Sequence, residues 1–514
     1  MVEPAAGASK AVGMVKVLSG RLLHGGWAIF LLPALLFALS SPGQAQKPGS
    51  VVLASSDARL LEGFNWAKMQ AMEYVHTGDP VGEWYVGGDP PRNAFCPRDI
   101  SHQSIGAQVL GLQQYTKNML YKLAKSISDS KDWAVYWEIN RNDVPAPEDY
   151  RSDKDFWFNL PANFDILQTC YRQYLWTGDR AYLEDPTFLN FYEETVNDYV
   201  KRWDKDGDGL MESRRAYRWR GIGSYDENLS LQPLMGSDLV AAQYAGYLAY
   251  SKIMALKGNT KAAKEYRHKA LIVKSLFNSD WWSNALQRHY TAMLQDKTFY
   301  GGYTDTFYYM LFWFGNIPEE GPKTNQTLEY LISHGAHNVE GMSYLPLIYY
   351  QYGRNDAAYA ALCQLIDPAL KRRDYPEVSY SVVGTVATGL MGISADASRR
   401  LVQTFPRLTR ETNWVSIDQL PVFGNEISVR HTGDNETTLT NQSGGPLQWK
   451  AAFKAPGDLP NLTSGELLVN DSPIEAHRGF QINEQRDIYV VLTVQPGQTY
   501  TVRLPMQHVK AGSE

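Results

Sequence analysis

The chain has 514 residues, 44% of them hydrophobic and 20% charged, which suffices for two or three domains with cores of their own. Its formal net charge of -6 argues against nucleic-acid binding. The 3 cysteines permit at most one disulfide, and because none of them forms a CxxC pair, no zinc or redox motif is visible. The composition therefore predicts an ordinary globular protein, and we expect no cofactor.

Residues 1–45 have the pattern of an export signal. Three basic residues precede the apolar stretch Trp27–Leu39, which is too short to span a bilayer comfortably. Gly43-Gln44-Ala45 is a small-x-small cleavage pattern, so the mature chain is predicted to begin near Gln46. The sequence thus predicts a secreted or periplasmic protein with no membrane association beyond this signal, and a retained anchor is the alternative.

Residues 46–397 are predicted to form a helical domain, because their apolar residues recur at three- and four-residue spacing. The helices are expected in hairpin-like pairs, joined by glycine or polar loops. They are predicted at Leu60–Val75, Ile100–Ile127, 161–177, Thr187–Trp203, Pro233–Lys257, Lys261–Phe277, Phe307–Phe314, Asn325–Ser333, Tyr344–Tyr352, Asp356–Ile366 and Val382–Met391.

Residues 398–514 have a different pattern, in which Val and Thr alternate with polar residues in short runs. Gly-Asn, Gly-Asp and Gly-Gly pairs separate these runs and mark turns. Strands are predicted at Glu426–Arg430, Thr437–Thr440, Leu447–Phe453, Glu466–Val469, Ile488–Val494 and Thr499–Leu504. Such a series predicts a small antiparallel β-sandwich behind the helical domain.

The stretch from Phe95 to Ser104 brings a carboxylate, a guanidinium and an imidazole together within ten residues. Pro97 marks a helix start, so Asp99 falls in the first turn, where the helix dipole and free backbone N–H groups favour a carboxylate. We expect Asp99, Arg98 and His102 at the mouth of the fold. The alternative interpretation is a structural carboxylate that only caps the helix and pairs with Arg98.

Several stretches resemble the six-hairpin glycosidases, most of all their α-L-rhamnosidase branch. Cys96-Pro97-Arg98-Asp99 resembles the rhamnosidase motif Cys-Pro-x-Arg-Glu, one residue shorter and with Asp as the acidic residue. Asp204–Leu210 resembles the DGDGL loop of these enzymes, and Gly341–Gln364 and Tyr375–Ile393 resemble their last helices. The resemblance implies an (α/α)6 toroid of six helical hairpins, followed by a C-terminal antiparallel β-sandwich, and a hydrolase for an α-L-rhamnoside-like terminal sugar. It also implies that Asp99 is the general acid.

Hydrolysis of a glycosidic bond needs a second carboxylate, which activates water or attacks the sugar. Glu377 and Glu340 stand just before predicted helices, and the resemblance places the base nearer to Glu377. Asp226 and Glu227 end a polar loop before another helix. Three roles are open for them: catalytic group, ligand for sugar hydroxyls, or helix cap. The resemblance further implies inversion, with the acid and the base about 6.5–9.5 Å apart.

Other candidate residues concern the substrate. Trp84, Trp157 and Trp219 are predicted in loops, where an indole can form a sugar platform. Arg220 ends the arginine-rich segment Arg214–Arg220, which is either a solvated basic loop or a clamp for a substrate carboxylate. A clamp would favour a uronide-specific glycosidase over a rhamnosidase.

Two further functions remain open from the sequence. A polysaccharide lyase on a similar toroid would use a histidine–tyrosine pair, for which His102 is a candidate, to remove a proton next to a uronate. A non-catalytic carbohydrate-binding protein would keep the fold without the chemistry, since fold does not fix function. The partner in every case is a glycoside or an oligosaccharide.

The loop from Asp204 to Leu210 invites comparison with a calcium site. Asp204, Asp206 and Asp208 match positions one, three and five of an EF-hand, and Gly209 matches position six. Position twelve is Arg215, where a bidentate Glu is required. The sequence therefore predicts a tight turn between helices and no EF-hand or other metal site, with a weak ion site at this loop as the alternative.

Overall fold

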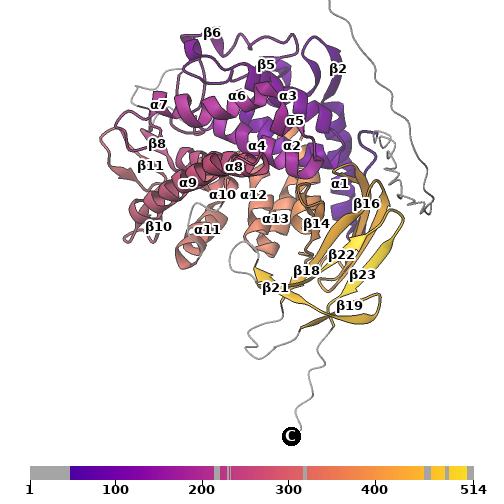
Figure 1. The fold of residues 1–514 in the computed structure, drawn as a ribbon. Coiled ribbons are helices and arrows are strands. Elements are labelled where there is room, and N and C mark those ends of the chain that lie inside the picture. The colour runs from indigo at the N-terminus through magenta and orange to yellow at the C-terminus, as the bar shows by residue number, and fades with distance from the viewer. Residues whose placement is uncertain are drawn as a thin grey trace, which may run out of the picture. The chain divides into compact units, whose positions relative to one another are not determined.

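The structure is a computed structural model (Figure 1) and describes residues 47–213, 220–227, 231, 233–315, 321–455, 465–480 and 486–505. The predicted export signal, Trp219 and the segment 214–218 lie outside these residues. Residues 43–514 form one compact unit. None of its described helices combines the length and the apolar character needed to cross a bilayer.

Six helices form an inner set in which each contacts the next, and the last contacts the first. In contact order they are α2 (Pro97–Val109), α4 (Ala162–Thr177), α8 (Ser237–Leu256), α10 (Asp305–Trp313), α12 (Val339–Gln351) and α14 (Pro376–Gly384). Figure 1 shows α2, α4 and α8 side by side. This closed series of contacts explains why the inner helices are buried on nearly every face.

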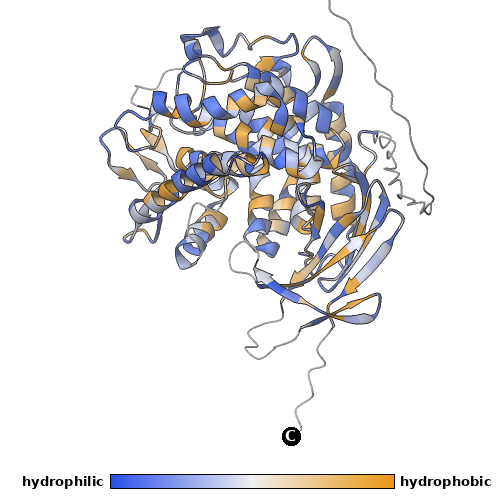
Figure 2. Cartoon of the chain, viewed as in Figure 1, coloured by the Kyte–Doolittle hydropathy of each residue, from blue (hydrophilic) through white to orange (hydrophobic). Residues whose placement is uncertain are grey.

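Between successive inner helices the chain forms outer helices, which expose one face. They are α1 (Ala58–Glu73), α3 (Gln113–Lys125), α6 (Pro186–Glu194) with its continuation α7 (Val200–Trp203), α9 (Thr260–Asp280), α11 (Pro322–His334) and α13 (Asn355–Leu365), and a short helix, α5 (Ala181–Glu184), precedes α6. In α9 the buried residues are Tyr266, Ala270, Val273 and Phe277, spaced three or four apart. The mixed colours of this helix in Figure 2 reflect that amphipathic pattern.

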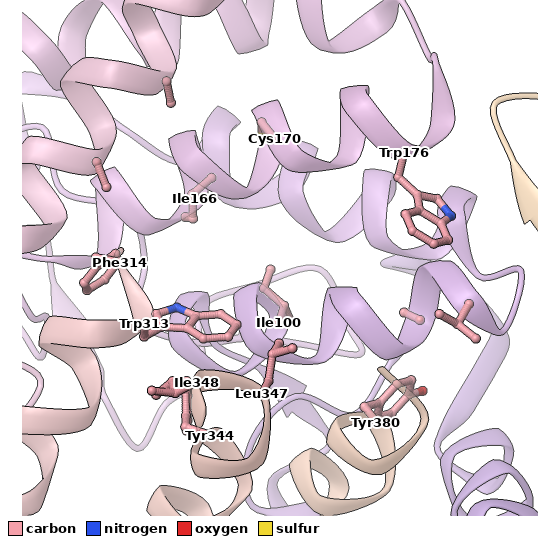
Figure 3. Close-up of a cluster of buried hydrophobic side chains, with 14 of the residues drawn as sticks. Ile100, Ile166, Cys170, Trp176, Trp313, Phe314, Tyr344, Leu347, Ile348 and Tyr380 are labelled. Carbon is pink, nitrogen blue, oxygen red and sulfur yellow. The ribbon is translucent and has the colours of Figure 1, made fainter. Parts of the chain in front are cut away.

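Side chains of α2, α4, α10 and α12 fill the space that the inner helices enclose. Figure 3 shows Ile100 of α2, Ile166 of α4 and Trp313 of α10 within this cluster, close to Tyr344 of α12. All four are buried. The aromatic residues counted in the sequence therefore serve largely as core, as is usual for large helical domains.

Gly106 allows α2 and α14 to approach each other closely. A Cβ atom at this position would lie 2.1 Å from the backbone carbonyl oxygen of Tyr380. Because backbone cannot swing aside as a side chain can, we expect Gly106→Ala to lower the free energy of unfolding by at least about 1–3 kcal/mol, the usual cost of overpacking. Gly246→Ala is the matched control, since its Cβ would meet only the Phe164 side chain. Equal losses in chemical denaturation of both variants would contradict this account.

Three helix boundaries differ from the sequence prediction in ways that matter for the site. The predicted helix Ile100–Ile127 is two helices, α2 and α3, because Gly111 has a positive φ of 78° and reverses the chain. Helix α14 begins at Pro376 and helix α12 at Val339, so Glu377 and Glu340 lie within first turns instead of before the helices. Proline is well suited to a first helical position, which explains the earlier start of α14.

Two sheets contain most of the described C-terminal residues. The larger has the order β1 (Val52–Ser55), β15 (Trp414–Val422), β16 (Asn425–Thr432), β17 (Glu436–Ser443), β23 (Thr499–Arg503), β19 (Glu466–Val469) and β20 (Ser472–Glu475). The smaller has the order β13 (Ser394–Asp396), β14 (Leu401–Thr404), β18 (Leu447–Lys454), β22 (Arg486–Val494) and β21 (His477–Phe480). Burial alternates along β16 and β17, as expected for sheets with one covered face.

This β part departs from the prediction in two respects. Strands β14 and β18 pair in parallel, so the sheets are not purely antiparallel. Strand β1 comes from the N-terminal side of the helices and pairs with β15, so the β part is not confined to the predicted range 398–514. Both features join segments far apart in the chain, which a local strand pattern does not reveal.

The remaining strands are short and belong to loops between helices. They are β2 (Val75–Asp79), β3 (Gly82–Tyr85), β4 (Ala94–Phe95), β5 (Ile139–Asn140), β6 (Tyr150–Ser152), β7 (Asp155–Phe156), β8 (Met235–Gly236), β9 (Trp282–Ser283), β10 (Arg288–His289), β11 (Ala292–Met293) and β12 (Phe299–Tyr300). Strand β4 pairs with β5 and leads directly into α2. The residues directly before α2 are therefore fixed by the hydrogen bonds of this strand pair.

Candidate active site

The first turn of every inner helix contains an acidic residue. These residues are Asp99, Asp165, Asp238, Asp305, Glu340 and Glu377. The outer helices α1, α3, α6, α9 and α11 have none there, whereas the outer helix α13 has Asp356. A carboxylate in a first turn is stabilised by the helix dipole and by free backbone N–H groups. The helix starts of the inner set therefore carry a concentration of acids.

Asp99 lies in the first turn of α2, as the sequence predicts, with Cys96 as the N-cap residue and Pro97 as the first helical residue. Its Oδ1 atom accepts a hydrogen bond from Cys96 Sγ at 3.1 Å and lies 3.3 Å from Arg98 Nε. Its Oδ2 atom accepts a hydrogen bond from the Tyr375 hydroxyl at 3.3 Å. Both oxygens of the carboxyl group are therefore held in fixed positions.

Arg98 connects Asp99 to acids from two other parts of the chain. Its Nη2 atom lies 3.3 Å from Oε2 of Glu340 in α12, and its Nη1 atom lies 3.5 Å from Oε1 of Glu227. The guanidinium also lies over the Trp137 ring, 5.9 Å from the ring centroid. One cation thus gathers three carboxyl groups that are distant in sequence, which its planar fork of donors permits.

Exposure to solvent increases across this group. The side chains of Asp99 and Glu377 are 1% and 0% exposed, whereas those of Glu340 and Glu227 are 25% and 43% exposed. Burial raises the pKa of Asp99 to about 6, against the opposing effect of Arg98. Burial also raises the pKa values of Glu340 and Glu227, although Arg98 lowers them in part. Glu340 and Glu227 therefore combine partial access to solvent with a protein environment that disfavours their charge.

Glu377 and His102 form a buried pair between α14 and α2. The distance between Glu377 Oε1 and His102 Nδ1 is 3.0 Å. The imidazole is stacked on the Tyr344 ring, with centroids 3.7 Å apart, and meets the edge of Trp313 at 5.2 Å. His102 therefore lies in the site, as predicted, but behind the carboxyl group and not at the solvent surface.

The segment carrying Asp226 and Glu227 is fixed by two buried acids. Asp238 Oδ2 accepts hydrogen bonds from the Ser224 hydroxyl at 3.0 Å and from the backbone N–H of Tyr225 at 2.5 Å. The Tyr225 hydroxyl donates to Asp165 Oδ2 at 3.1 Å. Asp226 itself is buried, with its backbone N–H bonded to Ser224, so of the two predicted acids only Glu227 contacts Arg98.

Two predicted substrate-binding residues are wrong. Trp84 is fully buried, stacked on His76, and its Nε1–H donates to Asp79 at 2.8 Å, so it offers no face to a sugar. Arg220 is 8% exposed and bonds Asp132 and the carbonyl of Asp153. Its guanidinium is already satisfied by protein groups and is not available for a substrate carboxylate.

Arg220 lies over the rings of Phe156 and Phe158, at 5.3 and 5.4 Å from their centroids. We expect Arg220→Met to lower the free energy of unfolding by up to about 3–5 kcal/mol, because it removes the closer of the two arginines that pair with the buried Asp132 and leaves only Arg202 at 3.5 Å. The preference for uronides over neutral glycosides should not change. Arg151→Met, at a side chain that is 65% exposed, should have little effect on stability. A selective loss of uronide turnover in the Arg220 variant would contradict this assignment.

The two remaining tryptophans give no support for a platform. Trp157 is half-buried, and its Nε1–H donates to Asn159 at 2.9 Å. Trp219 lies outside the described residues. The aromatic residues that contact the site are Trp137, Tyr344 and Tyr375, which the sequence alone did not single out because nothing local distinguishes them from core aromatics.

The acidic loop has the geometry of a turn. Asp204 accepts hydrogen bonds from the backbone N–H groups of Gly207 and Gly209, and Asp208 accepts one from that of Leu210. The Asp204, Asp206 and Asp208 oxygens lie within 4.8 Å of one another. Two of these three carboxylates thus stabilise the turn itself, in agreement with the tight-turn interpretation.

No protein-family model matches this chain, and no curated protein does. Solved structures do. The α-L-rhamnosidase from Dictyoglumus thermophilum has a TM-score of 0.56 at 13% identity, over 88% of this chain and 50% of that one. The Streptomyces avermitilis α-L-rhamnosidase complexed with L-rhamnose has a TM-score of 0.56 at 13% identity, over 88% of this chain and 42% of that one. A putative kojibiose phosphorylase from human microbiome has a TM-score of 0.52 at 9% identity, over 88% of this chain and 68% of that one.

This chain therefore spans about half the length, or less, of the rhamnosidases it resembles. At such low sequence identities the structural likeness establishes the fold but does not identify the substrate. The described residues form a helical part with two sheets, in agreement with that likeness. The chain thus shares the fold of these α-L-rhamnosidase structures, and its resemblance to them is confirmed at the level of the fold.

Proposed function

We propose that this chain is an exported glycoside hydrolase that removes a terminal neutral sugar by acid–base catalysis between carboxyl groups. It does so on an (α/α)6 toroid followed by a β-sandwich. The observation that carries the proposal is the contact of Arg98 with Asp99, Glu227 and Glu340, beside a fourth acid, Glu377. Carboxyl groups in unlike environments are what glycosidic cleavage needs, since one must be protonated and another ionised.

Asp99 is the proton donor in this proposal, and Glu340 is the favoured base. An inverting base must activate a water molecule, and the side chain of Glu340 is 25% exposed whereas that of Glu377 is 0% exposed. The sequence ranked these two residues in the opposite order. Glu227 shares Arg98 with the other acids and is the most exposed, which suits a ligand for sugar hydroxyls.

The charge of the site favours a neutral substrate. Asp99, Glu227 and Glu340 surround Arg98, and Arg372 lies 3.6 Å from Glu340, so both arginines already face carboxylates. A uronate would add a further negative charge to this group, and like charges in a site are a strong barrier to binding. The names of the structural neighbours, two of them α-L-rhamnosidases, support an α-L-rhamnoside-like sugar.

The lyase alternative receives less support. A lyase base must reach the proton of the substrate, but the side chain of His102 is 2% exposed and faces Glu377 and Tyr344. Burial lowers the pKa of His102 to about 3. That shift would make the ring a poor proton acceptor at neutral pH.

A panel of aryl glycosides tests the proposed function. We expect release of the aryl group from a neutral glycoside, with an α-L-rhamnoside among the substrates, and none from uronides. Proton NMR should detect inversion in the first sugar released. Ultraviolet absorbance of an unsaturated product would indicate a lyase, and sugar binding without turnover would indicate a non-catalytic protein.

The rate should fall as the pH rises through about 6. A general acid acts in its protonated form, and Asp99 has a pKa raised to about 6, so deprotonation above this value removes the donor. The measurement is kcat/KM against pH, which reports the free enzyme. A rate that stays level to pH 8 would mean that another group donates the proton.

A further inference from the structure

The hydrogen bonds of the His102–Glu377 pair depend on a proton whose position can be deduced. His102 Nδ1 lies 3.0 Å from Glu377 Oε1, whereas Glu377 Oε2 is buried without a hydrogen-bond partner among the described residues. A proton on this carboxyl group therefore finds an acceptor on Oε1, where it faces Nδ1, and finds none on Oε2. A neutral ring with its hydrogen on Nε2 has a lone pair on Nδ1, and Glu377 is then the donor.

The alternative is an ion pair in which a doubly protonated ring faces an ionised Glu377. The two side chains are 2% and 0% exposed, so both charges would lie out of water, at a cost of several kcal/mol per ion. The aromatic rings of Tyr344 and Trp313 cover the imidazole and supply no countercharge. Burial has the largest effect on the pKa of the ring and lowers it; Arg172 and Arg98 lower it further, whereas Asp99 and the Ser343 backbone raise it.

The carboxyl side of the pair gives the same result. Glu377 Oε2 is buried and makes no hydrogen bond of normal geometry among the described residues, although the Tyr344 hydroxyl favours the charged form weakly. An ionised carboxylate would leave this oxygen without the donors that it needs. Asp99 has Arg98 and Cys96 as donors, so of these two neighbouring carboxyls Asp99 is the one that ionises first.

Of the other titratable groups near Glu377, Arg98 alone favours its charged form. Glu340 of α12 opposes ionisation of Glu377, and Arg98 of α2 favours it. Tyr309 of α10 and Tyr375, next to α14, have pKa values raised by burial and remain neutral. Arg98 is thus the one cation acting on this carboxyl among these groups, and it already contacts three other acids.

We infer that Glu377 is a neutral carboxylic acid at neutral pH, that His102 is the positioning residue that accepts its proton in a hydrogen bond, and that Glu377 is not the general base. Burial raises the pKa of Glu377 to about 8 and lowers that of His102 to about 3, in agreement. The catalytic consequence rests on the proposed function, because it leaves the base to Glu340 or Glu227. The protonation state does not rest on it.

Infrared spectroscopy of the full-length protein tests this state without any substrate. At pH 7 the wild type minus Glu377→Gln difference spectrum should contain the carbonyl band of a protonated carboxyl group, shifted in heavy water. The matched control is Glu329→Gln, at a side chain that is 57% exposed and paired with Arg354, and its difference spectrum should contain only carboxylate bands. Carboxylate bands alone for Glu377 would overturn the inference.

Thermal unfolding against pH provides a second test, because it reports how many protons the folded pair retains. If the folded pKa of Glu377 is about 8, its stabilising effect is complete below about pH 4.5 and is lost as the pH rises to about 8. Glu377→Gln donates to Nδ1 at every pH, so the Tm of the variant relative to wild type should rise over this range. A relative Tm that stays level would indicate an ionised Glu377 beside a neutral ring. An ion pair retains the same single proton as the neutral pair, so nitrogen-15 NMR of wild-type histidines distinguishes these two, and an imidazolium at pH 7 for His102 would refute the inference.

Discussion

Replacing Asp99 with Asn should lower kcat by at least about a hundredfold, the usual value of general acid catalysis. An amide keeps the shape of the side chain but cannot give a proton to the leaving oxygen. Because the Cys96 and Tyr375 contacts are hydrogen bonds that an amide can largely retain, the fold should persist. The loss should be smaller for substrates with good leaving groups, such as activated aryl glycosides, which need less protonation.

The control for this variant is Asp305→Asn. Asp305 occupies the first turn of α10, as Asp99 does in α2, but it pairs with His337 and not with Arg98. Its replacement should therefore have a much smaller effect on kcat. Near-normal turnover by a folded Asp99→Asn protein would remove Asp99 from the mechanism.

Replacing Arg98 with Met should lower the free energy of unfolding by about 3–5 kcal/mol, as is usual when one partner of a buried ion pair is removed. The guanidinium is 13% exposed and contacts Asp99, Glu227 and Glu340, so its loss leaves three acids facing one another. The pKa of Asp99 should rise, because the cation that opposes its shift is gone. Urea denaturation and the pH dependence of kcat/KM measure these two effects.

A double-mutant cycle distinguishes repulsion from lost packing. Adding Asp99→Asn to Arg98→Met removes one of the unpaired charges, so the double variant should be less destabilised than the sum of the single losses. Arg372→Met, at a 55% exposed side chain 3.6 Å from Glu340, should change stability little. Additive losses would mean that Arg98 stabilises the fold by packing alone.

The features that the sequence predicted correctly depend on residues that are only a few positions apart in the chain. Pro97 and Asp99 together define a helix start with an acid in its first turn, and the structure has both in those positions. Apolar spacing likewise predicted the inner and outer helices, with boundaries displaced where Gly111 or Pro376 changes the backbone. Such signals act within a few residues and so can be read from one sequence.

The residues that the sequence misjudged depend on distant partners. Trp84 was predicted as a platform because it is in a loop, but Asp79 and His76 bury it in a hairpin. Arg220 was predicted as a clamp because arginines cluster there, but Asp132, far earlier in the chain, binds it. Tyr344 reaches the site because its ring stacks on His102 of α2, and Tyr375 reaches it because α14, which it precedes, contacts α2. No local sequence pattern distinguishes a side chain that has such a distant partner from one that is available to bind a substrate.

Strand β1 has a consequence for how the chain matures. Ser55 and Trp414, which are joined by a hydrogen bond between β1 and β15, are 359 residues apart. During synthesis β1 leaves the ribosome before α1 and the later described helices, and its partner follows only after these helices have been made. Until then β1 has unpaired backbone groups that can join another chain, and short strands of this kind are sites of aggregation. A chain cut before β15 would keep all six inner helices and still lack the partner for its first strand.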